Sequence, residues 1–141
     1  MHETLRPFHL AIPVTDLEKA KTWYRDKLGC SFGREASNWV DFNFFGHQLV
    51  AHLVNASSKS SETNMVDGQD VPSRHFGIIL TLKDWDSLAQ RLKKKNVHFL
   101  LLPQTRFRGE AGEQSTFFIE DPFGNALEFK SFRDDFQIFT V

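Results

Sequence analysis

The sequence predicts an α+β fold in which one strand–helix–strands module occurs twice in tandem. Residues 8–14 form a short apolar run followed by apolar residues at helical spacing, and residues 75–82 begin the same pattern again. The two starts align, with His9-Leu-Ala-Ile-Pro-Val-Thr on His75-Phe-Gly-Ile-Ile-Leu-Thr. Two copies of one module commonly pack about an approximate two-fold axis. We therefore expect one curved mixed sheet around a central metal cavity.

The first module is predicted to contain a strand, a helix and then two or three strands. Thr15 and Glu18 have the spacing of a capping box, and Gly29 stands where a left-handed residue ends a helix. Gly46 marks a hairpin turn between two further apolar runs. We expect a helix between Thr15 and Gly29, and strands at 8–14, 39–45 and 48–54, with an earlier strand near 30–34.

The second module repeats this order. Asp84 is positioned to cap a helix that stops at Asn96. The segment Asp121-Pro-Phe-Gly-Asn125 has the composition of a tight turn between two strands. We expect strands at 75–82, 97–102, 115–120 and 125–132.

A polar segment separates the two modules. Residues 55–64 are small and polar, and Asp67-Gly68 carries a turn signal, which indicates a connector that lies on the surface. The predicted organisation is a single domain over residues 1–141. Its parts are module one at about 5–55, a connector at 56–72, module two at about 73–133 and a C-terminal tail at 134–141.

The composition excludes several classes of protein. The chain has 17 Lys and Arg against 18 Asp and Glu, so we expect no general attraction to nucleic acid or to acidic membranes. No stretch approaches the ~20 apolar residues of a membrane span, and the first residues lack the apolar run of a signal peptide. Cys30 is the single cysteine, which fits a reducing compartment. We therefore expect a cytoplasmic protein.

Two histidines and one glutamate are the predicted metal ligands. His9 and His75 open equivalent strands of the repeat, so an approximate two-fold axis would turn both toward one cavity. Glu128 lies between Leu127 and Phe129 on the last strand, where a buried carboxylate needs a partner. Two His and one carboxylate form a facial triad that suits Fe(II) and leaves about three coordination positions open. The alternatives are strand-end histidines bonded to backbone and a Glu128 that lies in water.

His52 is the predicted catalytic acid or base. Counted from the turn glycines Gly46 and Gly124, Val50 corresponds to Glu128, and His52 lies two residues further along on the same face. Neutral imidazole titrates in the range that acid–base catalysis uses. A fourth metal ligand and a core histidine are the alternatives for this residue.

Four motifs carry a resemblance to a known family. They are Phe8-His-Leu-Ala-Ile-Pro-Val-Thr-Asp-Leu17, Trp23-Tyr24 before Leu28-Gly29, His75-Phe-Gly77 and Asp121-Pro-Phe-Gly-Asn-Ala-Leu-Glu-Phe129. With them the chain resembles the vicinal oxygen chelate superfamily over residues 5–133. That superfamily includes glyoxalase I, bleomycin- and fosfomycin-resistance proteins and type I extradiol dioxygenases. Within it, the chain looks most like small stand-alone proteins described as predicted extradiol-type dioxygenases.

The resemblance implies a fold of paired βαβββ modules, with metal ligands at His9, His75 and Glu128 and with His52 as the acid/base. It implies a dioxygenase-like enzyme that acts on a small vicinal diol or other chelating substrate. Fe(II) with O2 is favoured, and Mn(II), Zn(II) or Ni(II) fit the same ligands. Extradiol members usually carry a Tyr ten residues before the Glu ligand, where this chain has Phe118.

Two other functions remain open at this point. One is a metal-dependent lyase, isomerase or transferase of the same superfamily. The other is a non-catalytic protein that binds a small aromatic compound in a Phe-lined groove. A small molecule is the expected partner in each case, without nucleic acid or membrane. Because superfamily members often pair, we expect a homodimer.

Overall fold

The structure, a computed structural model, describes residues 4–56, 63–66 and 68–141. It divides into two compact units, residues 1–58 and 59–141. Each unit contains one four-stranded mixed sheet and one long helix, so the predicted tandem of βαβββ modules is confirmed. No helix of the described residues is long and apolar enough to cross a membrane.

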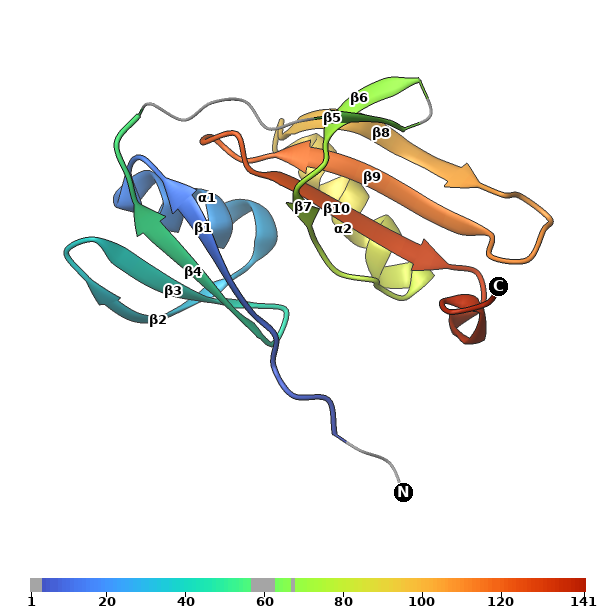
Figure 1. The fold of residues 1–141 in the computed structure, drawn as a ribbon, viewed down its shortest axis with the longest axis horizontal. Coiled ribbons are helices and arrows are strands. Elements are labelled where there is room, and N and C mark those ends of the chain that lie inside the picture. Colours follow the sequence, from blue (N-terminus) through green and yellow to red (C-terminus); the bar gives the residue numbers. More distant parts are fainter. Residues whose placement is uncertain (1–3, 57–62, 67) are drawn as a thin grey trace. The chain divides into compact units, whose positions relative to one another are not determined.

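The first unit has the sheet order β1-β4-β3-β2 (Figure 1). The first strand runs parallel to the last one, and the remaining neighbours are antiparallel. Helix α1 covers one face of this sheet, where Tyr24 is fully buried and stacks on Phe42 with ring centroids 5.0 Å apart. The elements are β1 (His9–Val14), α1 (Leu17–Leu28), β2 (Ser31–Ala36), β3 (Trp39–Phe44) and β4 (His47–Leu53).

The ends of α1 follow local chemistry. The cap is Asp16, whose carboxylate accepts a hydrogen bond from the backbone N–H of Lys19 at 3.0 Å, rather than the predicted Thr15. Asp is as good an N-cap as Thr, and its position one residue later matches a helix that begins at Leu17. Gly29 ends the helix with φ of 74°, as predicted.

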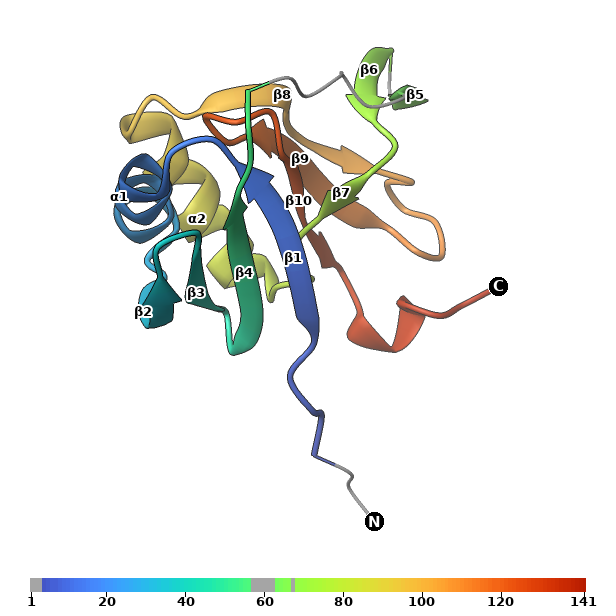
Figure 2. The same ribbon diagram turned by 60° about the vertical axis from the view of Figure 1, so that its left-hand side comes forward.

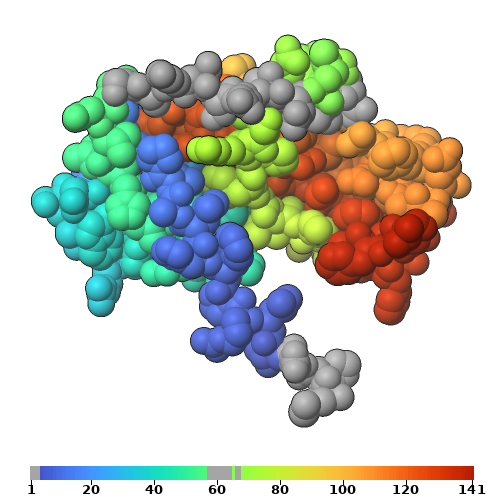
Figure 3. All heavy atoms as spheres, viewed as in Figure 1, coloured from blue at the N-terminus to red at the C-terminus, as the bar shows by residue number. Residues whose placement is uncertain are grey.

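The second unit has the same topology, with the sheet order β7-β10-β9-β8. Figure 2 shows the short strand β7 running beside β10, to which it is parallel. The elements are β7 (His75–Phe76), α2 (Leu82–Lys94), β8 (His98–Arg106), β9 (Gln114–Glu120), β10 (Ala126–Phe132) and the 3-10 helix η1 (Asp135–Gln137). In Figure 3 the C-terminal residues lie against the loop between β8 and β9, where the N–H of Gly112 donates to Gln137 at 2.8 Å.

Helix α2 begins earlier than the sequence pattern suggested. Thr81 is its N-cap and accepts a hydrogen bond from the backbone N–H of Asp84, the residue that we expected to be the cap. The buried face of α2 packs on the sheet, and the indole N–H of Trp85 donates to the carbonyl oxygen of Phe129 at 2.9 Å. This bond ties the helix to the strand that carries Glu128.

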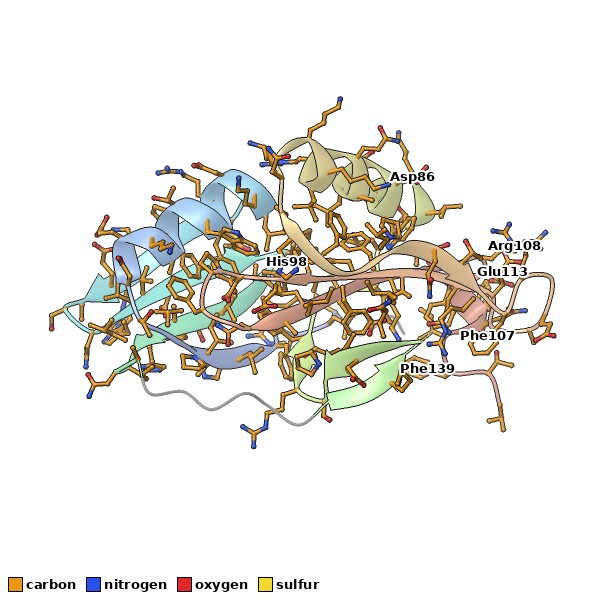
Figure 4. The ribbon with its side chains drawn as sticks, turned by 90° about the horizontal axis from the view of Figure 1, so that it is seen from above. Asp86, His98, Phe107, Arg108, Glu113 and Phe139 are labelled. Atoms are coloured by element: carbon orange, nitrogen blue, oxygen red, sulfur yellow. The ribbon has the colours of Figure 1, made fainter. Side chains whose placement is uncertain are left out.

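The connector contains a hairpin that the sequence did not predict. Strands β5 (Thr63–Val66) and β6 (Gln69–Pro72) pair across Gly68, which has a φ of 81°. Val71 is fully buried against Leu101 and Phe118, so the hairpin covers the face of the sheet opposite α2 (Figure 4). Residues 57–62, which also belong to the expected connector, lie outside the described residues.

The two first strands occupy the same register in their sheets. His9 pairs with Gln48, two residues after Gly46, and His75 pairs with Ala126, two residues after Gly124. The sequence repeat is therefore also a repeat of strand pairing. This pairing fixes the position of each histidine relative to the last strand of its own sheet.

A close backbone contact holds residues 75–80 on β10. A Cβ atom built on Gly77 would lie 1.5 Å from the carbonyl oxygen of Glu128, so no other residue fits there without separating the two segments. Hydrogen bonds from Lys130 N to Ile78 O at 3.2 Å and from Leu80 N to Lys130 O at 2.7 Å continue the pairing past β7. Gly77 thereby allows His75 to lie beside Glu128.

We predict that Gly77→Ala lowers the free energy of unfolding by about 3 kcal/mol, because the added methyl group overlaps backbone that cannot move aside alone. The matched control is Gly109→Ala, where the added Cβ meets open space and the cost is the left-handed φ of 79°, about 1 kcal/mol. Urea unfolding of both variants checks the difference. Equal losses would contradict the close contact.

Candidate metal centre

His75 and Glu128 form an ion pair in the second unit. His75 Nε2 lies 3.3 Å from Glu128 Oε1, and the two side chains are 29% and 14% exposed. The contact follows from the parallel register, because the histidine pairs with the residue two positions before the glutamate. Side chains two residues apart on a strand share a face. Two of the three predicted ligands are therefore brought together.

The orientation of His75 is fixed by an acceptor. Its Nδ1 lies 2.9 Å from the carbonyl oxygen of Pro72. A carbonyl oxygen only accepts, so Nδ1 carries the proton and donates it. In neutral His75 the lone pair of Nε2 is then directed at the carboxylate, which also presents lone pairs. Such a pair requires a proton or a cation between the two groups.

The orientation of Glu128 is fixed by a hydroxyl donor. Thr116 is fully buried and donates from Oγ1 to Glu128 Oε2 at 2.5 Å. One carboxylate oxygen is thus bound within the sheet, and the other faces His75. Sequence inspection gives no signal for Thr116, because it lies on a neighbouring strand at a spacing that no local motif contains.

The charge state of the pair follows from these contacts. The hydrogen bond to Glu128 raises the pKa of His75 above its ordinary value. Burial alone raises the pKa of Glu128, but the hydrogen bonds from His75 and Thr116 and the charge of Lys130 outweigh it, so this pKa lies below its ordinary value. Without a metal ion, both shifts therefore favour the ionised pair, with a protonated imidazole and a charged carboxylate.

His9 is oriented in the first unit by a side-chain relay. Gln48 donates from Nε2 to Asp41 Oδ2 at 3.3 Å, so its Oε1 faces His9 Nδ1, which lies 2.8 Å away. An amide oxygen accepts, so His9 carries its proton on Nδ1 and presents the Nε2 lone pair. His9 and His75 therefore share one tautomer, which suits a metal ligand.

His52 lies on the same face of the first sheet as His9, further along the strands. It pairs with Pro13, four residues after His9, which corresponds to ~13 Å along a strand. Metal–nitrogen bonds are ~2 Å long, so His52 and His9 cannot hold the same ion as neighbouring ligands. Among the residues that the structure describes, the imidazole of His52 has no hydrogen-bond partner. An acid–base role for it stays a prediction.

One side of the pair is lined by the aromatic ring of Phe118. Phe118 pairs directly with Glu128 across β9 and β10, and its ring contacts that of His75 edge-to-face with centroids 4.9 Å apart. Where extradiol enzymes usually carry a phenol, this chain has a ring without a hydroxyl.

In the part of the chain that the structure describes, neither unit contains a complete set of metal ligands by itself. Within the described residues of either unit, no group of three or more His, Cys, Asp or Glu side chains lies close enough together to hold a metal ion.

Two further titratable side chains, Cys30 and His98, are not part of this pair. Cys30 is buried, and its burial raises the pKa of the thiol to about 12, as expected for an inert core residue. His98, which is labelled in Figure 4, begins β8 and is exposed, and its Nδ1 lies 3.7 Å from Oε2 of the half-buried Glu120.

We predict that, in the metal-free protein, Glu128→Gln lowers the pKa of His75, because the raising hydrogen bond and charge are lost. The matched control Glu120→Gln leaves it unchanged. Titration of the imidazole by NMR checks this.

The ion pair also makes the stability of the fold depend on pH. Its contribution is fully present between pH 4.5 and pH 6.5, the ordinary pKa values of the glutamate and histidine side chains. It declines as the pH falls through the lowered pKa of Glu128 or rises through the raised pKa of His75. A pKa of His75 that does not respond to Glu128→Gln would contradict the pairing.

We also predict that Gln48→Met converts His9 from the Nδ1–H tautomer to a mixture, because the acceptor is lost. Nitrogen chemical shifts of the imidazole at high pH measure the tautomer. His47 is the internal control, since its Nδ1 accepts from the N–H of Phe8 at 2.8 Å and its proton must be on Nε2. An Nε2–H tautomer of His9 in the unaltered chain would refute the relay.

Comparison with known proteins identifies the family. The model of the Glyoxalase/Bleomycin resistance protein/Dioxygenase superfamily matches residues 6–129. A crystal structure of a glyoxalase/bleomycin resistance protein/dioxygenase from Alicyclobacillus acidocaldarius is 37% identical, with 99% of this chain and 100% of that chain covered and a TM-score of 0.82.

Two further relatives have more specific names. The glutathione transferase FosA of Serratia marcescens is 25% identical over 120 residues, which is 85% of this chain and 76% of that protein. The fosfomycin resistance protein FosX of Listeria monocytogenes shares the fold with a TM-score of 0.68 at 16% identity, over 93% of this chain and 94% of that one. On the family match and the shared fold, the chain belongs to the glyoxalase/bleomycin resistance protein/dioxygenase superfamily, the vicinal oxygen chelate proteins.

Proposed function

We propose that this chain is a metal-dependent enzyme whose small substrate chelates a divalent cation through two oxygens. The cation is held by His9, His75 and Glu128. The observation that carries the proposal is the approach of His75 Nε2 to within 3.3 Å of Glu128 Oε1, with each side chain held by a separate hydrogen bond.

The spacing of these two atoms fits a metal site. Ligand atoms at ~2.1 Å from an ion and at right angles to each other are ~3.0 Å apart. The separation of 3.3 Å is close to this value. Oriented histidine and carboxylate ligands of this kind are typical of catalytic metal sites, where the outer hydrogen bonds hold the ligands in place.

His9 is proposed as the third ligand on two grounds. It has the register position in its own sheet that His75 has in the second sheet. It also carries its proton on Nδ1, which leaves Nε2 to bind a metal ion. Two His and one carboxylate leave positions on the ion for a chelating substrate.

A bound divalent cation supplies Lewis-acid polarisation of the chelated oxygens. The chain contributes the orientation of its ligands, through Pro72, Thr116 and Gln48. Phe118 excludes water from one side of the pair. His52 is proposed to move a proton on the substrate, at a point remote from the ligands.

Addition or group transfer is the reaction class that we favour. Phe118 stands where a phenol would serve extradiol ring cleavage, and the relative from Serratia marcescens is a glutathione transferase. The second candidate is an Fe(II)-dependent dioxygenase, favoured by the facial set of ligands. A protein that only binds a small aromatic compound is the third.

One set of assays separates the three. Protein loaded anaerobically with Mn(II), Zn(II), Ni(II) or Fe(II) is given fosfomycin, with and without glutathione, and separately a catechol panel with O2. We expect product from fosfomycin without O2, and a loss of at least about 100-fold in kcat/KM for Glu128→Gln, because a ligand charge is removed. Glu120→Gln is the matched control and should keep its activity.

The other outcomes have definite meanings. Oxygen uptake with a catechol that depends on Fe(II) would replace transfer with dioxygenase chemistry. No bound metal, together with unchanged affinity for an aromatic ligand in His9→Ala, would refute the proposal and favour the binding protein.

A further inference from the structure

A pocket of about 310 Å³ lies beside the candidate ligands in the second unit. It is lined by residues 75–79 and by two side chains of β10, Glu128 and Lys130. His75, Glu128 and Lys130 are the ionisable side chains of this lining. Two of them belong to the proposed metal site, which leaves Lys130 without a role there.

Lys130 is held on the ligand face of the sheet. It lies two residues after Glu128 on β10 and pairs with Thr116 on one side and with Ile79 on the other. Its backbone N–H and carbonyl are both hydrogen-bonded to the segment that follows β7. Residues two apart on a strand lie ~6.6 Å apart, so the amine is within the reach of a small molecule bound at the ligands.

The ammonium group of Lys130 is not needed to neutralise Glu128. Both oxygens of that carboxylate already have partners, His75 and Thr116. Among the residues that the structure describes, no acidic side chain forms an ion pair with Lys130, whose amine lies 5.9 Å from the centre of the Phe132 ring. Its charge nevertheless acts on the pair, since it lowers the pKa of both His75 and Glu128.

The charge of the occupied pocket favours an anion. With a divalent cation at the ligands, Glu128 cancels one of its charges, and Lys130 adds another positive charge nearby. Like charges this close repel each other unless a negative group lies between them. A ligand with an oxyanion would remove this repulsion and accept a charge-assisted hydrogen bond from the amine.

We propose that Lys130 forms an anion subsite next to the metal position, so that the substrate of the proposed enzyme is a small chelating molecule with a carboxylate, phosphate or phosphonate group. This inference rests on the proposed function. Lys130 recognises the negative group, while the remaining oxygens of the substrate are directed toward His75 and Glu128. The subsite thus selects among chelating molecules by charge.

Calorimetric titration with inorganic phosphate and with acetate tests the subsite. Both anions are titrated into metal-free and Mn(II)-loaded protein. For Lys130→Gln we expect the affinity for the anions to fall about 10- to 100-fold, the loss that follows removal of a charged hydrogen bond. Lys130→Arg should retain most of it, and Lys94→Gln, which removes the same charge from the exposed end of α2, should be unchanged. The anion that binds more tightly identifies the class of negative group.

Mn(II) binding is measured separately, so that the two proposals fail in different ways. We expect Lys130→Gln to bind Mn(II) at least as tightly as the unaltered chain, because a repelling charge is gone. Equal anion affinities of Lys130→Gln and the unaltered chain, in both forms of the protein, would overturn the subsite. Absence of Mn(II) binding with anion binding that still depends on Lys130 would overturn the metal site and leave the subsite intact. An unchanged urea midpoint of Lys130→Gln confirms that the variant is folded.

Discussion

Parallel pairing of the first and last strands within each module is the constraint on which the rest of the structure depends. It places His9 and His75 at equivalent register positions. Each histidine pairs with the residue that lies two positions after the turn glycine preceding the last strand of its sheet. In the second unit this pairing also brings the imidazole to the carboxylate of Glu128. The approach is close enough that Gly77 has no space for a side chain. Packing of the sheet and placement of the candidate ligands therefore have one cause.

A second layer of contacts turns these positions into oriented ligands. Each histidine donates from Nδ1 to a group that can only accept there, the carbonyl of Pro72 or the amide oxygen of Gln48. Glu128 is held by a buried hydroxyl from the neighbouring strand. These bonds remove rotational freedom that a metal ion would otherwise have to remove on binding, so they favour a preorganised site.

Much of the fold was predictable from the sequence, because it is carried by local patterns and by a repeat. Apolar periodicity located both long helices, and the turn glycines located the hairpins. The helix caps were misplaced, since Asp16 and Thr81 each lie next to or near another residue of good capping type. The hairpin β5–β6 was missed because polar residues dominate it, although Val71 packs in the core.

The candidate site, like the fold, was predictable from the sequence only in part. His75 was singled out through the repeat and Glu128 through its apolar neighbours, and the two are in contact. The roles of His9, His75 and Glu128 as ligands of one metal ion remain a proposal. Thr116 and Gln48 could not be found, because they act through side-chain hydrogen bonds between strands that no sequence spacing encodes. In the sequence, Lys130 is only a charged residue on a predicted strand. Its position in the lining of the pocket becomes evident from the pairing of the strands in the sheet.

Metal content is the most direct test of the central claim. Elemental analysis of the purified chain, His75→Ala, His9→Ala and the control His98→Ala would decide whether one ion depends on both histidines. The account predicts about one divalent metal ion per chain in the unaltered protein and in His98→Ala, and a strong loss in the other two variants. Full occupancy in both His75→Ala and His9→Ala would contradict it.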